Sequence, residues 1–351
     1  MIVGIDIGTQ SLKVAVVDRA MRVCGEAATS YRPSFPRPGW AEQDPALWEQ
    51  ALGPTIARAL GQAGAAPAQV QALGICGQLD GCVAVDADGR PLTPCLIWMD
   101  RRAQAEIAGV PAVLVRKRAG VVVDAGHMAA KIRWLKRHDA RAAAAARFHQ
   151  PVSYLVERLT GRAVMDHALA STSMVYAIDG RNFDPALLDC FEIDAAELPE
   201  LAEADSCAGP LSSHGADLTG LPAGIPVAVG TGDDFSTPLG GGVAEPGTVA
   251  NVLGTAEVVG ALDPRPLIDA DGLVETHRFV GSQLHYIENP GWVSGGALEW
   301  LRVLLRIADF AAFDAVAAAA SAGADGLLFL PALTGAMTPE WHAGARGCFY
   351  G

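Results

Sequence analysis

Two stretches that lie far apart in the sequence share one pattern of residues, and this repetition limits the folds that the chain can adopt. Residues 2–7 and 12–18 are apolar and rich in β-branched side chains on either side of a short polar turn, which predicts a β-hairpin. The same pattern returns in residues 248–260, around Gly254-Thr255. We interpret the two hairpins as an internal repeat.

The repeat predicts two domains, residues 1–243 and 244–351, with the second beginning just before its hairpin. The length of the chain, 351 residues, also favours two domains over one. A cleft between two such domains is a natural place for a ligand that contacts both.

Strands and helices alternate between the two hairpins. Asp44 is expected to cap a helix that starts at Pro45 and that kinks or ends at Gly53-Pro54. A buried strand is expected at residues 72–76, and helices at residues 131–147 and 152–159. This alternation predicts an α/β fold.

Composition and charge exclude several classes of partner. The formal net charge is -13, which argues against binding to nucleic acid or to an anionic membrane surface. The seven cysteines are scattered without a C-x-x-C pair, as expected of reduced thiols in the cytoplasm. We find neither a signal peptide before Asp6 nor an apolar run long enough to span a bilayer. The sequence therefore predicts a soluble, cytoplasmic protein.

The two Gly-Thr turns are candidates for phosphate binding. A tight turn exposes consecutive backbone N–H groups, and the hydroxyls of Thr9 and Ser11 add donors. Asp6, on the strand before the first turn, would then be placed to hold Mg²⁺ through its water ligands. Each turn taken alone is equally well explained as an ordinary hairpin, but two in equivalent positions favour phosphate. Because the sequence has neither a P-loop nor a G-x-G-x-x-G motif, a nucleotide would have to use the paired hairpins.

Two adjacent carboxylates follow the next strand pattern. Residues 226–229 lead into the glycine-rich segment Gly230-Thr231-Gly232-Asp233-Asp234. One aspartate is expected to cap a helix that begins near Phe235. The other is then available as a general base, which would take a proton from a hydroxyl that attacks a phosphoryl group.

A third polar segment, Trp98-x-Asp100-x-Arg102, follows an apolar strand and is preceded by Gln78-Leu79-Asp80-Gly81. On an extended backbone Asp100 and Arg102 would point to one side, where they could bind neighbouring hydroxyls of a polyol. The alternative is a surface ion pair of little energetic weight. Trp40, in the segment GWAEQDP, is more simply explained by packing than by stacking on a sugar.

Together these segments resemble the FGGY family of carbohydrate kinases, most closely its xylulose kinase branch. The resemblance extends from residue 1 to residue 351, and its specificity comes from the order and spacing of the motifs. They are GIDIGTQSLK at 4–13, GWAEQDP at 39–45, W-x-D-x-R at 98–102, LTG at 159–161 followed by Asp166, GTGDD at 230–234, LGT at 253–255, GGALEWL at 295–301 and ARG at 345–347.

The resemblance implies an actin-like, ribonuclease H-like pair of domains that close over a sugar and MgATP. It implies that Asp233 is the catalytic base and that Asp6 serves Mg²⁺. The residues implied to bind ATP are Gly8, Thr9, Gln10, Ser11, Lys13, Gly254 and Thr255. Those implied to line the sugar pocket are Gln78, Leu79, Asp80, Trp98, Asp100, Arg102 and Asp233.

The implied reaction is ATP-dependent phosphorylation of a primary hydroxyl, with D-xylulose converted to D-xylulose 5-phosphate. Ribulose, gluconate, other ketoses and linear polyols stay open as substrates, because Leu79-Asp80 stands where xylulose kinases usually carry Met-His. Family members continue past the length of this chain into an adenosine-binding segment, so we expect the second domain to be incomplete and its exposed apolar surface to favour a homodimer.

Two other classes of protein fit the sequence less well. A catalytically impaired sugar-binding derivative is consistent with the shorter chain, but Asp6, Thr9, Asp233 and Thr255 are all retained. An actin-like chaperone or filament protein would share the phosphate hairpins and would have no use for the W-x-D-x-R segment.

Overall fold

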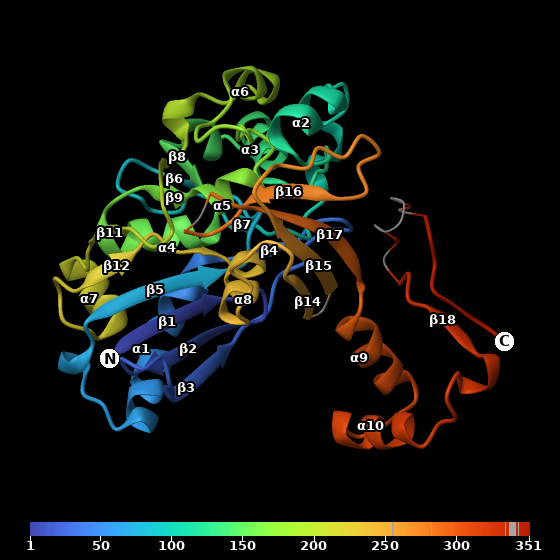
Figure 1. Cartoon of the computed structure of the whole chain (residues 1–351). Coiled ribbons are helices and arrows are strands. Elements are labelled where there is room, and N and C mark those ends of the chain that lie inside the picture. The colour runs from blue at the N-terminus through green and yellow to red at the C-terminus, as the bar shows by residue number, and fades with distance from the viewer. Residues whose placement is uncertain (255, 282, 334, 337–341, 343) are drawn as a thin grey trace.

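The computed structural model describes the chain except for residues 255, 282, 334, 337–341 and 343 (Figure 1). Its main sheet has the strand order β11-β12-β5-β1-β2-β3, and the short β13 also pairs with β5. Strand β2 is antiparallel to both β1 and β3, whereas β5 runs parallel to both β1 and β12. The bounds are β1 Ile2–Ile7, β2 Ser11–Val17, β3 Val23–Ser30, β5 Ala72–Gly77, β11 Cys207–Pro210, β12 Pro226–Ala228 and β13 Thr231–Gly232.

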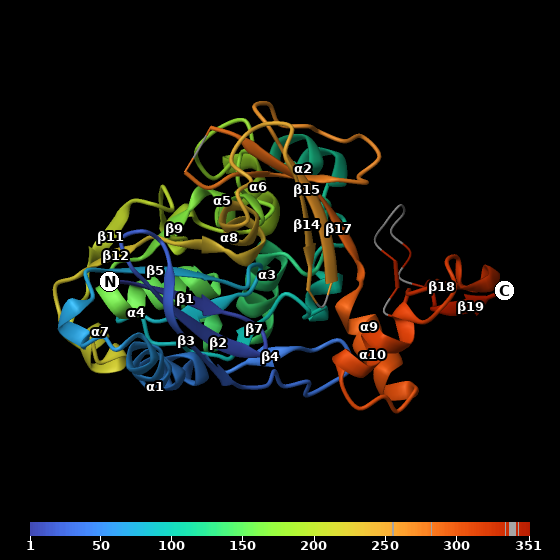
Figure 2. The same ribbon diagram turned by 60° about the horizontal axis from the view of Figure 1, so that its bottom comes forward.

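Successive side chains of β1 lie on opposite faces of the main sheet. Val3, Ile5 and Ile7 are buried in the main core, whereas Gly4 and Asp6 lie on the other, partly open face. Helices α1 (Pro45–Ala63), α4 (Pro151–Thr160) and α7 (Ser213–Thr219) pack together with this sheet (Figure 2). The first predicted hairpin is therefore confirmed, and Asp6, the polar residue of β1, lies on the face that the core leaves open.

Helix α1 confirms the predicted N-cap and excludes an end at Gly53-Pro54, which was one of the two outcomes predicted there. Its N-cap is Asp44, whose side chain accepts a hydrogen bond from the backbone N–H of Ala46. The helix does not end at Gly53-Pro54, because it runs on to Ala63. Pro54 is exposed, whereas the buried face continues beyond it through Ile56, Ala59 and Leu60. Burial of that face stabilises the helix across the proline.

A layer of short elements covers the region between the main sheet and the second sheet (Figure 1, upper part). The predicted helix over residues 131–147 is too long, because α3 ends at His138 and residues 142–144 form only a 3₁₀ turn. The bounds of the elements are β4 Glu42–Gln43, β6 Val83–Val85, β7 Cys95–Leu96, α2 Ala112–Ala119, α3 Met128–His138, β8 Arg147–His149, β9 Val164–Asp166, α5 His167–Ser171, α6 Pro185–Phe191 and β10 Glu200–Ala202.

The second sheet is antiparallel, with the strand order β14-β15-β17-β16. It confirms the second predicted hairpin, because β14 and β15 pair directly. A small core that includes Phe235, Phe279 and Tyr286 joins this sheet to helix α8. The bounds are α8 Asp233–Gly240, β14 Val249–Leu253, β15 Ala256–Asp263, β16 Glu275–Arg278 and β17 His285–Val293.

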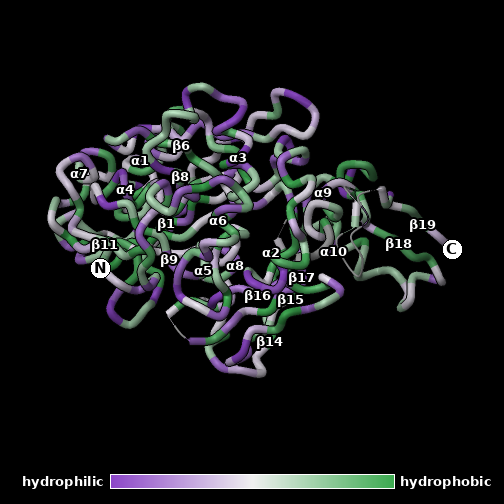
Figure 3. Tube along the Cα trace, turned by 90° about the horizontal axis from the view of Figure 1, so that it is seen from above, coloured by the Kyte–Doolittle hydropathy of each residue, from purple (hydrophilic) through white to green (hydrophobic). Residues whose placement is uncertain are grey.

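The last described segments project away from the rest of the molecule in all three ribbon and tube views (Figures 1, 2 and 3). They are α9 (Gly295–Leu304), α10 (Phe310–Ala318), β18 (Leu328–Leu330) and β19 (Cys348–Tyr350). Large apolar side chains are exposed on them, among which Trp300 is 40% and Tyr350 is 76% exposed. Among the described residues, no helix combines the length and apolarity needed to cross a bilayer.

Candidate functional site

Several predicted site residues lie at the carboxyl ends of β1 and β5, which are adjacent strands of the main sheet. Asp6 lies near the end of β1, and Gln78 and Asp80 follow the end of β5. Thr231 and Gly232 of β13 pair with Cys76 and Gly77 of β5, so the start of α8 lies beside the same edge. The fold therefore brings Asp6 and Asp233 together, although 227 positions separate them in the sequence (233 minus 6).

A groove of about 740 Å³ runs along the open face of the sheet next to Asp6. Small residues line its floor, including Gly4, Ala15 and Gly74, and its polar wall contains Asp6 and Lys13. Thr231 and Ser236, which flank the two aspartates, line the same groove. A second pocket, of about 550 Å³, is lined by residues 35–41 and Met99 and shares no lining residue with the groove.

The turn of the first hairpin is held by a network of buried amides. The side-chain amide of Gln43 donates to the carbonyl of Thr9 (2.6 Å), and that of Gln78 donates to the Gln43 Oε1 atom (2.6 Å). The indole N–H of Trp98 donates to the Thr9 hydroxyl (3.0 Å). The backbone N–H of Gly8 is bonded to the Ser11 carbonyl, whereas Gln10 is exposed. Gln78 and Trp98 thus support the turn, and Gln43 is a part of this site that the sequence alone did not single out.

Asp6 has one satisfied and one unsatisfied carboxylate oxygen. Lys13, its cross-strand neighbour, places Nζ 3.2 Å from Asp6 Oδ2. Asp6 Oδ1 is buried and has no hydrogen-bond partner within the described part of the chain. No cluster of three or more His, Cys, Asp or Glu side chains arranged around a metal occurs among those residues. The free oxygen fits a hydrated cation that takes its other ligands from water and phosphate.

The two adjacent aspartates both lie in the first turn of α8, which corrects the prediction that one of them caps the helix. The N-cap is Gly232, and the helix starts at Asp233. Burial and the nearby carboxylate of Asp6 raise the pKa of Asp233 to about 6. Burial and the carboxylates of Glu288, Asp233 and Asp80 raise the pKa of Asp234 well above its usual value. A base with a pKa close to neutral is suited to proton abstraction at physiological pH.

Asp166, which follows the LTG segment, contacts the glycine-rich segment that leads into α8. Its carboxylate caps α5 and accepts a hydrogen bond from the hydroxyl of Thr231 (2.9 Å). This bond links β9 and α5 to the glycine-rich segment, in which Thr231 lies two residues before Asp233.

Asp80 is held in a strained backbone conformation by three partners. Its φ angle is 58°, which non-glycine residues seldom adopt. Its N–H donates to Gln150 Oε1 (2.7 Å), and its carbonyl accepts from Lys131 Nζ (2.6 Å). Its Oδ2 atom lies 3.0 Å from His127 Nδ1. Leu79, just before it, packs against both hydrophobic cores. Such over-determined strain is typical of functional positions.

Asp100 and Arg102 lie in a turn and at the start of a 3₁₀ helix, so the prediction of an extended segment is wrong. They form a buried pair with Nη2 of Arg102 2.7 Å from Oδ2 of Asp100, which excludes the alternative of a surface ion pair. Arg102 also binds Glu42 (2.7 Å) and lies 3.6 Å from the centroid of the Trp40 ring. Asp100 accepts from the N–H of Ala41. Their polar groups are therefore engaged in joining two loops.

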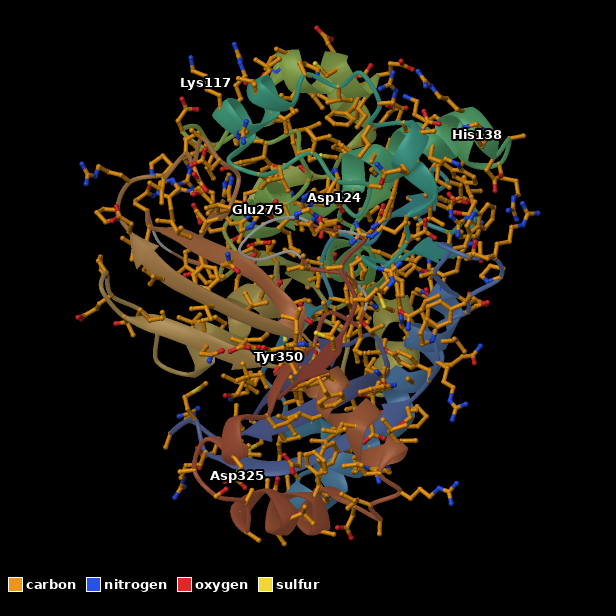
Figure 4. All side chains as sticks on the ribbon, turned by 90° about the vertical axis from the view of Figure 1, so that its right-hand side faces the viewer. Lys117, Asp124, His138, Glu275, Asp325 and Tyr350 are labelled. Carbon is orange, nitrogen blue, oxygen red and sulfur yellow. The ribbon has the colours of Figure 1, made fainter. Side chains whose placement is uncertain are left out.

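The second sheet adds residues that the sequence reading missed. Glu275 and His277 on β16 and Glu288 on β17 are buried, and Glu275 contacts the first-domain segment that carries Asp124 (Figure 4). The available signal was the run of four polar residues that makes up β16, Glu275 to Arg278. Gly254, at the turn of the second hairpin, is exposed, and its carbonyl accepts from the N–H of Gly295 (3.0 Å). Thr255 lies outside the described residues.

Comparisons with known proteins agree with this arrangement. Residues 1–240 match the model of the FGGY family of carbohydrate kinases, N-terminal domain. A glycerol kinase of Rhodospirillum centenum is 32% identical and a xylulose kinase of Escherichia coli K12 is 29% identical, and each match covers 100% of this chain and 72% of the relative. The crystal structure of a xylulose kinase from Rhodospirillum rubrum superposes with a TM-score of 0.87 at 29% identity, covering 99% of this chain and 72% of that one. The α/β sheets with their two hairpins, the edge that carries Asp6 and Asp233, and these matches together establish that the chain belongs to the FGGY family of carbohydrate kinases, which are phosphotransferases.

Proposed function

We propose that the chain transfers the γ-phosphoryl group of ATP to a primary hydroxyl of a ketose or polyol, with D-xylulose as the first candidate. The observation that carries the proposal is the position of Asp233, which begins α8 beside Asp6 and has a pKa near 6. A single base next to a carboxylate with a free oxygen is the arrangement that phosphoryl transfer to an alcohol needs.

In this proposal Asp233 removes the proton of the attacking hydroxyl while the oxygen of that hydroxyl forms a bond to the γ-phosphorus. The bond from that phosphorus to the bridging oxygen breaks, and ADP leaves. The turn from Gly8 to Ser11 and the exposed ammonium of Lys13 would hold phosphate oxygens, as would the turn at Gly254. Asp6 would hold Mg²⁺ through water, and that ion, when bound, would neutralise phosphate charge.

We further propose that residues 1–243 and 244–351 act as two lobes whose approach excludes water from the site. Contacts between the lobes support this proposal, because Glu275 Oε1 accepts a hydrogen bond from the N–H of Val122 (2.9 Å). The W-x-D-x-R segment would act mainly by supporting the Thr9 turn, which Trp98 contacts, with Gln78 and Asp80 on the sugar side of it.

Glycerol is the second candidate acceptor. It is favoured by a specific observation, since relatives named glycerol kinase match the full length of this chain, one of them at 32% identity. Both candidates offer a primary hydroxyl next to a second oxygen, so the same base would serve either of them.

The test is an assay of acceptor-dependent ADP formation by the 351-residue chain with D-xylulose, D-ribulose, glycerol, xylitol and D-gluconate. We expect turnover with a ketose or polyol and a loss of about 10²- to 10⁴-fold in kcat for Asp233→Asn, as is typical when a general base is removed. The matched control is Asp88→Asn, since Asp88 pairs with Arg90 at an exposed site. Binding of an acceptor without any ADP formation would instead support the sugar-binding derivative.

A further inference from the structure

Phe235 lies two positions after the proposed base Asp233 in the first turn of α8, and its ring is fully buried. An α-helix has about 3.6 residues per turn, so side chains two positions apart point to nearly opposite sides of it. The Phe235 ring accordingly packs in the small core that joins α8 to the second sheet. Any influence of Phe235 on the carboxylate of Asp233 therefore passes through the backbone of α8.

Two rings of the second sheet contact the Phe235 ring. The centroid of the Phe235 ring lies 5.7 Å from that of His277 on β16 and 6.2 Å from that of Tyr286 on β17, and both pairs are edge to face. Aromatic pairs of this geometry attract each other beyond the burial of their area. His277 and Tyr286 are also direct cross-strand partners, so their rings form one surface. Helix α8 is thus attached to the second sheet two residues from Asp233.

The two rings of the second sheet are themselves fixed by their neighbours. His277 Nε2 lies 3.2 Å from Glu288 Oε1. Tyr286 packs directly over Gly260 of β15, because a Cβ atom added at Gly260 would overlap the Tyr286 ring. His277 and Tyr286 are both buried, and closely packed interiors leave little room for a ring to move. The surface that meets Phe235 is therefore defined by contacts among β15, β16 and β17.

The Phe235 ring also lies beside the residue that precedes Asp233. A Cβ atom added at Gly232, the N-cap of α8, would lie 3.3 Å from Phe235 Cδ2. From these contacts we infer that Phe235 is a positioning residue that fixes Asp233 from the second sheet. The inference rests on the proposed function, in which Asp233 is the base, and it adds that residues 244–351 position a base that residues 1–243 carry. Precise positioning matters because a misplacement of about 1 Å can lower a rate by about 10²-fold.

Phe235→Leu keeps an apolar side chain and removes both ring contacts. We expect kcat for acceptor-dependent ADP formation to fall by at least about 10-fold. KM for ATP and KM for the acceptor should stay within about 3-fold, because the other residues proposed to bind these substrates lie outside α8. The matched control is Phe191→Leu, since Phe191 is an equally buried phenylalanine of α6 in the main core. Both variants should lower the midpoint of thermal unfolding, whereas only Phe235→Leu should lower kcat.

Tyr286→Leu tests the same contact from the second sheet. We expect kcat to fall by at least about 5-fold, and the double variant to lose less than the product of the two single losses, because both changes remove one contact. A general loss of stability would not produce such non-additivity in kcat. The two positions lie on different elements, so misfolding of one variant leaves the other to decide.

The outcomes separate this inference from the proposed function. If the unaltered chain turns over and both Phe235→Leu and Tyr286→Leu keep kcat within about 2-fold of Phe191→Leu, the positioning role is overturned and the proposed function stands. If the unaltered chain forms no ADP with any acceptor, the proposed function is overturned and the inference falls with it.

Discussion

The indole nitrogen of Trp98 donates a hydrogen bond to the hydroxyl of Thr9 across 3.0 Å, so the W-x-D-x-R segment contacts the turn of the first hairpin. The family resemblance implies that Trp98 lies in the sugar pocket, whereas this bond connects it to the turn proposed to hold phosphate. The two assignments predict different kinetic consequences.

Trp98→Phe keeps most of the ring and removes the donor. We expect KM for ATP to rise by about 5-fold, the usual weight of one hydrogen bond, while acceptor affinity changes by less than about 2-fold. Steady-state kinetics with each substrate varied in turn measures both, and Trp300→Phe, at a 40% exposed position, is the control. A selective loss of acceptor affinity would return Trp98 to the sugar pocket.

The pH dependence of kcat/KM for the acceptor should report the titration of Asp233 in the free chain. The base acts in its deprotonated form, so the rate should rise with pH and level off above the pKa of about 6. The carboxylate of Asp6 contributes to that raised pKa, so Asp6→Asn should move the rising limb to lower pH as well as lowering the rate. A rate that stays constant between about pH 5 and 7 would exclude Asp233 as the base.

Arg102 is expected to stabilise the fold through a buried network. Arg102→Ala leaves the carboxylate of Asp100 buried without its partner, and breaking a buried pair in this way typically lowers the free energy of unfolding by about 3–5 kcal/mol. Arg90→Ala, which breaks an exposed pair with Asp88, should lower it by about 0–1 kcal/mol. Urea unfolding of both variants measures the difference, and equal values would show that Asp100 is solvated in the native protein.

Two glycines offer a paired test of how α1 packs on β3. A Cβ atom at Gly25 would lie 2.3 Å from the carbonyl oxygen of Ala59, so Gly25→Ala forces the helix away from the sheet and should destabilise the fold by about 1–3 kcal/mol. A Cβ atom at Gly61, inside α1, meets no described atom within 4 Å, so Gly61→Ala should stabilise by about 0.5–1 kcal/mol. Thermal unfolding of the two variants measures the sign of each change in stability. An unchanged stability in Gly25→Ala would mean that α1 can move away from β3 at no cost in free energy.

Local patterns were sufficient to predict the hairpins, the cap at Asp44 and the strand that carries Asp6, because alternation and capping depend on near neighbours. The continuation of α1 past Pro54 could not be predicted, since it depends on a buried face provided by the sheet. The position of Asp233 inside α8 was also missed, because a glycine N-cap leaves no side-chain signature.

The contacts that join Asp80, His127, Glu275, His277 and Glu288 could not be predicted for a different reason. They depend on the register that sets Glu275 opposite Glu288 and on the contact of His127 with β16, from which His127 is distant in the sequence. Spacing along the sequence carries no information about such a contact. The same holds for Arg102, whose burial between Trp40 and Glu42 follows from the way two loops meet.

The alternation along β1 links accurate folding to catalytic competence. Asp6 has paired neighbours on both sides, Lys13 on β2 and Cys76 on β5. Because successive side chains of a strand face opposite ways, a slip of one residue would turn Asp6 into the core and bring Val3, Ile5 and Ile7 out of it. A misregistered chain would then bury an uncompensated charge and expose three large aliphatic side chains, so it would be unstable as well as inactive. Quality control that recognises exposed apolar surface would remove such molecules without any means of sensing the active site.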